Sequence, residues 1–159
     1  MRESILALFP RFYDGRQTAS AATYIGEVDL TLIEDRTYFV HEAGDEIVAC
    51  GGWSRRDKLY TGSGDAAGDA RLLDPGTEPA RVRAMFVRDG WTRRGLGRAI
   101  LESCERAARA EGFTMLSLMA TLPGEPLYRA CGFERLHDVD VTMPDGVAIP
   151  GVAMEKSID

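Results

Sequence analysis

Residues 92–112 read TRRGLGRAILESCERAARAEG, a glycine-containing turn followed by a helical pattern. Four apolar residues fall on one stripe at helical spacing: Leu96, Ile100, Cys104 and Ala107. Oppositely charged residues stand four positions apart on another face, and Gly112 is typical of a helix C-terminus. The sequence therefore predicts a helix over residues 97–111, preceded by a tight turn.

The turn has the properties of an anion-binding site. Gly95 and Gly97 allow the backbone to approach a ligand closely, and the first N–H groups of a helix lack intrahelical partners. The helix dipole adds positive potential at the same end. Residues 88–98 contain four arginines and one aspartate, a local net charge of +3 in a chain whose net charge is -6. A pyrophosphate suits this turn, although an ordinary tight turn with solvated arginines is the alternative.

Two nucleotide-binding motifs do not fit this turn. The Gly-Lys-Ser/Thr sequence of phosphate-binding loops is missing, and so is the third glycine of the dinucleotide-binding fingerprint. The basic patch of residues 88–98 is local, as a small polyanionic cofactor requires.

Short β-rich runs flank the turn and its helix. Residues 80–87 (ARVRAMFV) and 115–121 (MLSLMAT) are typical of buried strands, and residues 123–130 favour a short helix that opens with proline. Two antiparallel hairpins are predicted, residues 38–42 with 46–53 and residues 139–143 with 147–154.

The N-terminal part and one long connection are less regular. Residues 3–9 favour a short helix, and Thr18 is a candidate cap for a second helix that reaches about residue 25. Residues 27–35 fit either a helix or an extended chain. Residues 57–79 are rich in Gly, Asp, Ala and Pro, which predicts a long surface loop of the kind that often covers a substrate site.

Composition restricts the class of protein. The 159 residues, 45% hydrophobic and 28% charged, fit a single globular domain over residues 1–159. A net charge of -6 argues against nucleic acid and anionic membranes as partners. The three cysteines form no C-x-x-C pair and the two histidines are isolated, so we expect no metal site, no disulfide framework and a cytoplasmic location. No apolar run approaches the roughly 20 residues of a membrane span.

Four ordered segments give the chain a resemblance to the GNAT superfamily of N-acetyltransferases. They are the strand ARVRAMFV, the turn and helix RRGLGRAILESCERAARAEGF, the strand MLSLMAT and the segment GEPLYRACGFER. The resemblance implies an α/β fold (mixed α+β) of three layers, whose mixed, mostly antiparallel sheet is splayed between residues 80–87 and 115–121 and flanked by helices. It also implies an acyltransferase that moves the acetyl group of acetyl-CoA to a primary amine by direct attack in a ternary complex.

The resemblance further implies which residues bind the cofactor. The strand at Met85, Phe86 and Val87 corresponds to the one that pairs with the pantetheine arm. The turn that binds the pyrophosphate corresponds to Thr92, Arg93, Arg94, Gly95, Leu96, Gly97 and Arg98. Tyr128 matches the tyrosine that commonly hydrogen-bonds the departing sulfur. Thr121 stands where the family frequently has an asparagine that contacts the cofactor, and Thr92 stands where Gln or Arg often begins the turn.

The acceptor side is harder to predict. Trp53 and Arg55 follow a pair of glycines in a predicted strand, and we expect them to line the acceptor cleft. Residues 80–85 carry no carboxylate that could serve as the general base. By composition the candidates are Glu27, Glu34 and Glu78, each of which is also explained as a solvated acid.

Several functional alternatives stay open at this stage. The missing base makes a non-catalytic acyl-CoA sensor of the same fold the second hypothesis. A small-molecule amine and a peptide amine are both open as the acceptor, and the acidic composition favours a cationic one. The oligomeric state is open as well, with a homodimer among the alternatives.

Overall fold

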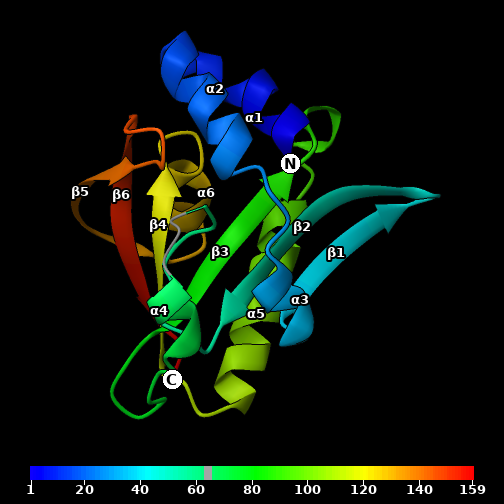
Figure 1. Ribbon diagram of the computed structural model, residues 1–159. Helices are drawn as coiled ribbons and strands as arrows, with labels where there is room; N and C mark the ends of the chain where they lie inside the picture. Colours follow the sequence, from blue (N-terminus) through cyan, green and yellow to red (C-terminus); the bar gives the residue numbers. More distant parts are fainter. Residues whose placement is uncertain (63–65) are drawn as a thin grey trace.

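A six-stranded sheet forms the centre of the computed structural model, which describes residues 1–62 and 66–159 (Figure 1). The strands are β1 (Tyr38–Ala43), β2 (Glu46–Ser54), β3 (Ala80–Val87), β4 (Met115–Thr121), β5 (Glu134–Thr142) and β6 (Ala148–Ser157). They lie in the order β1-β2-β3-β4-β6-β5. All neighbouring strands are antiparallel except β3 and β4, which are parallel.

The parallel strands β3 and β4 are paired only where they begin. Ala80 pairs with Leu116 and Arg81 with Ser117. Beyond these residues the two strands diverge toward their C-terminal ends (Figure 1). The sheet is therefore splayed between two adjacent strands, and the fold class predicted from the sequence is confirmed.

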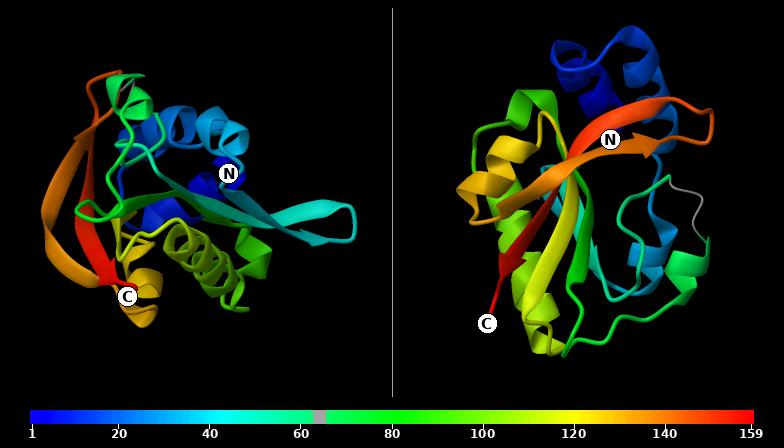
Figure 2. Two further views of the ribbon diagram at one scale, coloured as in Figure 1. Left: turned by 90° about the horizontal axis from the view of Figure 1, so that it is seen from below. Right: turned by 90° about the vertical axis from the view of Figure 1, so that its left-hand side faces the viewer.

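Helices cover both faces of the sheet. The α-helices are α1 (Arg2–Leu8), α2 (Gly15–Tyr24), α3 (Leu30–Glu34), α4 (Ala66–Ala70), α5 (Leu96–Ala110) and α6 (Glu125–Ala130), and η1 (Phe9–Arg11) and η2 (Asp89–Trp91) are 3-10 helices. α5 and α6 lie on one face and α3 and α4 on the other (Figure 2). α1 and α2 lie across the end of the sheet at which β3 and β4 diverge (Figures 1 and 2).

α5 packs on the sheet by its apolar stripe. Ile100, Leu101 and Cys104 are buried in the cluster beneath this helix. β2 approaches the helix closely because Gly51 has no side chain. A Cβ atom at this position would lie 2.0 Å from the Met85 sulfur and 2.8 Å from Cγ2 of Ile100. The helix thereby holds its N-terminal turn at a fixed place beside β3.

The N-terminal helices are fixed by a cap and by a buried tyrosine. The Asp14 carboxylate accepts a hydrogen bond from the Gln17 amide at 2.7 Å, and the Gln17 side chain accepts one from the Asp14 amide at 3.1 Å. The Tyr13 hydroxyl donates to the Pro150 carbonyl of β6 at 2.7 Å and accepts from the Leu122 amide at 2.8 Å. α1 and α2 are thereby tied to the ends of β4 and β6.

Most of the predicted elements are confirmed, and the differences have local causes. Thr18 lies inside α2 and is not its cap, because Asp14 caps the helix four residues earlier. Residues 27–35 contain α3, which the Asp29 carboxylate caps. β5 begins five residues before the predicted start, since its first half is exposed at the edge of the sheet and carries little apolar alternation. The predicted loop contains α4, and residues 63–65 lie outside the described residues.

Two further predictions concern membrane-spanning helices and metal sites. None of the helices described here is long and apolar enough to cross a membrane. Within residues 1–62 and 66–159, no group of three or more His, Cys, Asp or Glu is arranged to hold a metal ion.

Candidate active site

A cleft of about 640 Å³ opens where β3 and β4 separate. Four walls surround it: the edge of β3, the turn between η2 and α5, the end of β4 with α6, and the N-terminal helices with residues 59–61. The structure brings together in this cleft all of the cofactor-binding residues expected from the sequence except Arg94, and it adds Tyr128 to them. These residues come from four separate stretches of sequence.

β3 presents an unpaired backbone edge to the cleft. The Arg88 amide donates to the Val48 carbonyl of β2 at 2.9 Å, and Phe86, two residues earlier on the same edge of β3, pairs with Cys50 of β2. Backbone groups of an antiparallel strand alternate in direction, so those of Met85 and Val87 point away from β2 and toward the cleft. An extended ligand along this edge can form the hydrogen bonds that β4 does not form.

A β-bulge shapes the same strand. The register between β2 and β3 shifts between Cys50 and Gly52, and Ala84 has a φ of 58°. A positive φ is rare for a residue with a side chain, and a bulge bends its strand and increases the twist. The bulge thus accompanies the divergence of β3 from β4.

The turn before α5 is shaped by backbone conformation and by tight packing. Arg93 and Gly95 have φ values of 62° and 81°. A Cβ atom on Gly97 would lie 2.7 Å from Cδ2 of Leu127 in α6, so any larger residue there must displace this side chain. The first amides of α5 lack intrahelical partners, and the helix dipole favours negative charge at this end. The turn can therefore bind an anion such as a diphosphate.

Arginines add positive charge around the turn. Arg93 and Arg98 are exposed and line the cleft, and Arg98 also donates to the Ala130 carbonyl at 3.3 Å. The guanidinium of Arg94 instead lies 4.7 Å from the centre of the Trp91 ring. Two of these arginines are thus placed to meet a ligand, while Arg94 packs against η2.

Tyr128 brings a phenol to the cleft from α6. Its ring is buried, with the Phe133 ring edge-on at a centroid distance of 5.8 Å. Burial raises the pKa of Tyr128, and the thiols of Cys104 and Cys131 raise it further. The phenol is therefore protonated at neutral pH and can donate a hydrogen bond to a ligand. Thr121, at the end of β4, lines the same cleft.

The remaining wall is mostly apolar. We call it the apolar wall, and it consists of Ser4, Ile5, Leu8, Phe9, Ile25, Leu59, Tyr60 and Thr61. Among the described residues that line any part of the cleft, none is an Asp, a Glu or a His. The described walls thus offer cationic, hydroxyl and apolar groups, but neither a carboxylate nor an imidazole that could accept a proton.

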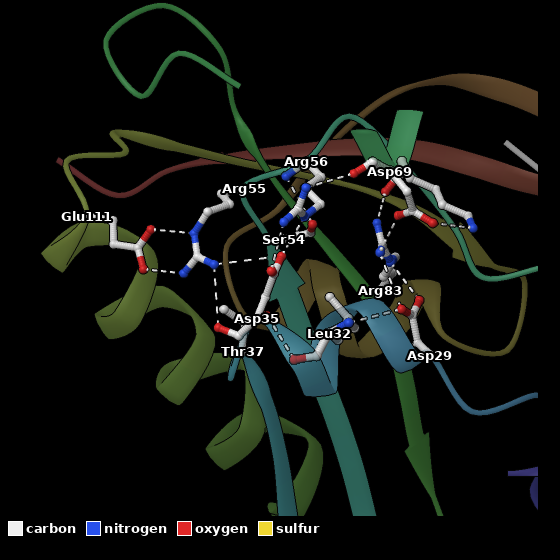
Figure 3. A network of polar contacts seen from close by, with 11 residues as sticks. Asp29, Leu32, Asp35, Thr37, Ser54, Arg55, Arg56, Asp69, Arg83 and Glu111 are labelled. Atoms are coloured by element: carbon white, nitrogen blue, oxygen red, sulfur yellow. Dashed lines mark hydrogen bonds and ion pairs between the residues drawn. The ribbon is translucent and has the colours of Figure 1, made fainter. Parts of the chain in front are cut away.

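Arg83 lines the cleft from β3 with its side chain only 1% exposed. Its guanidinium donates to the Asp29 carboxylate at 2.8 Å, to the Asp69 carboxylate at 3.1 Å and to the Lys58 carbonyl at 2.5 Å (Figure 3). Asp29 also accepts a hydrogen bond of 2.7 Å from the Thr61 hydroxyl. The positive charge of Arg83 is therefore neutralised within the protein.

The carboxylate of Asp29 is committed to this network. Burial alone would raise the pKa of Asp29, but the hydrogen bonds and charge of Arg83 outweigh it and lower that pKa. The sequence reasoning missed Arg83, although the alternation in ARVR places Arg81 and Arg83 on one face of the strand. Two arginines on one face of a buried strand are a signal that carboxylates lie opposite them.

Trp53 and Arg55 do not line the cleft, contrary to the sequence prediction. Trp53 is 1% exposed and packs edge-on against Phe113, with ring centroids 5.8 Å apart. Arg55 lies over the indole and forms an ion pair of 2.5 Å with Glu111 (Figure 3). The glycines before Trp53 allow β2 to pack closely against α5 and α3.

The three glutamates considered as a base lie elsewhere as well. Glu78 lies just before β3 and accepts a hydrogen bond of 2.8 Å from Arg71. This bond lowers the pKa of Glu78. Glu27 precedes α3 and Glu34 is the last residue of this helix, and both are exposed. None of the three is among the residues that line the cleft.

The amino-acid sequence matches the model of the acetyltransferase (GNAT) family over residues 2–133. The chain belongs to this family. The resemblance to the GNAT superfamily, inferred from the turn and its flanking strands, is therefore confirmed. The splayed sheet is the fold that this resemblance implies. No curated protein sequence gives a significant match.

Solved structures share the fold at low sequence identity. A GCN5-related N-acetyltransferase from Rhodopseudomonas palustris has a TM-score of 0.73 and 16% identity, covering 98% of this chain and 84% of that one. The PaiA N-acetyltransferase from Thermoplasma acidophilum, in complex with coenzyme A, has a TM-score of 0.65 and 11% identity over 98% and 87% of the two chains. YncA from Salmonella typhimurium, with its cofactor acetyl-CoA, has a TM-score of 0.54 and 15% identity over 77% and 64%.

Proposed function

We propose that this GNAT protein transfers the acetyl group of acetyl-CoA to a primary amine of a small-molecule or peptide acceptor. The cleft between β3 and β4, lined by the N-terminal turn of α5, is the observation that carries the proposal. Membership of an acetyltransferase family supports it, as do the coenzyme A and acetyl-CoA held by the T. acidophilum and S. typhimurium proteins. Because both the N-terminal helices and the sheet line this cleft, we also propose that residues 1–159 act as one domain.

In this proposal the cofactor lies along β3 and ends at the turn. The diphosphate accepts hydrogen bonds from the first amides of α5 and is neutralised by Arg93 and Arg98. The backbone of Met85 and Val87 pairs with the amides of the pantetheine arm. The full set of proposed cofactor-binding residues is Met85, Phe86, Val87, Thr92, Arg93, Gly95, Leu96, Gly97, Arg98 and Thr121, without Arg94, which packs against Trp91.

The reaction is a direct attack in a ternary complex. The neutral amine nitrogen attacks the thioester carbon, so that a C–N bond forms while the C–S bond breaks. Tyr128 stabilises the departing sulfur by donating a hydrogen bond. Since the pKa of Tyr128 is raised by burial and a thiol has a reference pKa of about 8.5, Tyr128 keeps its proton. The amine loses a proton, and the departing sulfur takes up a proton to become the thiol of coenzyme A.

A non-catalytic acyl-CoA sensor is the second candidate function. The observation that favours it is the lack of a carboxylate or imidazole among the described residues of the cleft. Tyr128 supports catalysis, because its protonated phenol lines the cleft and can donate a hydrogen bond to a leaving group.

One assay separates the two functions. The protein is incubated with acetyl-CoA and a panel of primary amines while free thiol is followed. Thiol release that depends on the amine supports the transferase, whereas tight binding of acetyl-CoA without such release identifies the sensor.

A further inference from the structure

The apolar wall is the part of the cleft left for the acceptor. The proposed function assigns the β3 edge, the turn and α6 to the cofactor. The wall that remains is dominated by the hydrocarbon side chains of Ile5, Leu8, Phe9, Ile25 and Leu59. Contact with such a wall stabilises an apolar group by about 25 cal/mol for each Å² removed from water. An acceptor with an apolar body is therefore favoured over a hydrated one.

The described walls of the cleft give a cationic acceptor no negatively charged partner. Arg93 and Arg98 are positive, and no described lining residue is negative. Asp29 lies behind Thr61, but both of its oxygens are engaged by Arg83, Thr61 and the Leu32 amide. An ammonium group would thus lose its hydration without gaining a counter-charge. The net charge of -6 does not alter this for the described part of the chain, because no Asp or Glu of residues 1–62 and 66–159 lines the cleft.

The protonation state of the acceptor amine also favours an amine of low basicity. An alkylamine with a pKa of about 10.4 is some 3.4 units from neutrality at pH 7, and about 4–5 kcal/mol is needed to remove its proton. No described residue of the cleft can take that proton. An arylamine is already neutral at pH 7, since its lone pair is shared with the ring. It needs no base before it attacks.

We infer that the acceptor is a small apolar amine of low basicity, with arylamines as its chemical class. This inference rests on the proposed function and names the substrate of the same cleft. The amine nitrogen forms the amide bond to the acetyl carbon, the C–S bond breaks, and one N–H proton ends on the coenzyme A thiol. The products are an acetanilide and coenzyme A.

Two isomeric amines test the inference directly. 4-Methylaniline and benzylamine have the same atoms and differ in basicity, and spermidine serves as a polycation. With acetyl-CoA at pH 7, we expect kcat/KM for 4-methylaniline to exceed that for benzylamine by at least about tenfold, because so little benzylamine is neutral. Between pH 7 and 9 the value for 4-methylaniline should stay flat, while that for benzylamine should rise about tenfold per pH unit.

A carboxylate introduced into the apolar wall should change this preference. Leu59 lines the cleft and is 39% exposed, so the fold tolerates a polar side chain there. Leu59→Glu should raise kcat/KM for benzylamine relative to 4-methylaniline by about tenfold, since the new carboxylate binds the cation and accepts its proton. Leu59→Gln is the uncharged match, and Leu72→Glu places the same charge at an exposed position outside the cleft. Neither control should shift the ratio.

The outcomes distinguish a failure of the arylamine inference from a failure of the proposed transferase function. A preference for benzylamine or spermidine at pH 7, or equal shifts in Leu59→Glu and Leu72→Glu, would overturn the inference and leave the transferase intact. Binding of acetyl-CoA without thiol release for any of the three amines would overturn the inference, and only the same result across the whole amine panel would overturn the transferase.

Discussion

At the scale of a single residue, Gly97 allows the turn before α5 to pack closely against α6. A Cβ atom there would lie 2.7 Å from Leu127, which lines the cleft beside Tyr128. We expect Gly97→Ala to push this side chain aside, at a cost of about 1–3 kcal/mol in the free energy of unfolding, and to weaken acetyl-CoA binding. Thermal unfolding and calorimetric titration measure the two effects.

A matched glycine provides the control for this substitution. Gly90 lies in η2, in the same connection, and a Cβ atom there would meet no other atom within 4 Å. Gly90→Ala should leave stability and binding unchanged. If Gly97→Ala behaves like Gly90→Ala, the contact with α6 does not require glycine.

Tyr128 carries the chemical step in the proposed mechanism. Tyr128→Phe removes the hydroxyl and keeps the buried ring, so the Kd of acetyl-CoA should stay the same while kcat falls by about 10²-fold. Steady-state kinetics and equilibrium binding give the two values. Tyr24→Phe, outside the cleft, is the control, and an unchanged kcat in Tyr128→Phe would remove Tyr128 from the mechanism.

At the scale of elements, the turn and α5 together act as an anion site. Because the backbone amides supply much of the binding, we expect Arg93→Ala and Arg98→Ala each to weaken acetyl-CoA binding by about tenfold or less, and the double variant to weaken it further. Both single variants should also reduce the dependence of Kd on salt. Titrations at low and high ionic strength measure this.

Arg106 on the exposed face of α5 is a suitable comparison. It contacts Ser103 of its own helix and lies outside the cleft. Arg106→Ala keeps the cofactor turn intact and should leave the Kd of acetyl-CoA unchanged. An effect equal to that of Arg93→Ala would mean that the overall charge of the protein, and no specific site, governs binding.

The buried ion pair of Asp29 and Arg83 joins the N-terminal segment to β3. Asp29→Asn leaves the Arg83 guanidinium partly unpaired at 1% exposure, so we expect a loss of about 3–5 kcal/mol in the free energy of unfolding. Chemical denaturation checks this value. Asp45→Asn in the exposed turn between β1 and β2 should have no such effect, and equal stability of the two variants would contradict a structural role for the pair.

The same pair makes stability depend on pH in one direction. The pKa of Asp29 in the folded protein is lowered below the unfolded value of about 3.9. Its contribution is therefore complete above about pH 4 and is lost as the pH falls through the folded pKa. Asp29→Asn should flatten this part of the acid-unfolding curve.

Helices and strands could be predicted from the sequence wherever a local pattern of apolar residues and glycines determines them. The bounds of β3 and β4 follow from apolar runs, and α5 follows from its stripe and its glycines. Thr18 was wrong as a cap because Asp14 and Gln17 form a reciprocal cap before it. Trp53 was wrong as a cleft residue because the glycines beside it serve helix packing, which a strand pattern alone does not reveal.

At the scale of the whole molecule, β3 packs against two hydrophobic clusters. Met85 packs against the cluster beneath α5, and its neighbour Phe86 packs against the cluster beneath the N-terminal helices. β3 therefore supports both halves of the protein while its backbone edge stays unpaired. The apolar wall forms only when residues 4–25 and 59–61 meet over this strand, so no single stretch of sequence could have predicted it.

The central claim is that the turn of α5 binds the diphosphate of a coenzyme in the cleft between β3 and β4. Isothermal titration calorimetry of the protein with acetyl-CoA tests it most directly. The account predicts saturable heat for one site per chain, weakened in the double variant of Arg93 and Arg98 and unchanged in Arg106→Ala. No heat at millimolar acetyl-CoA, or equal binding by all of these proteins, would contradict it.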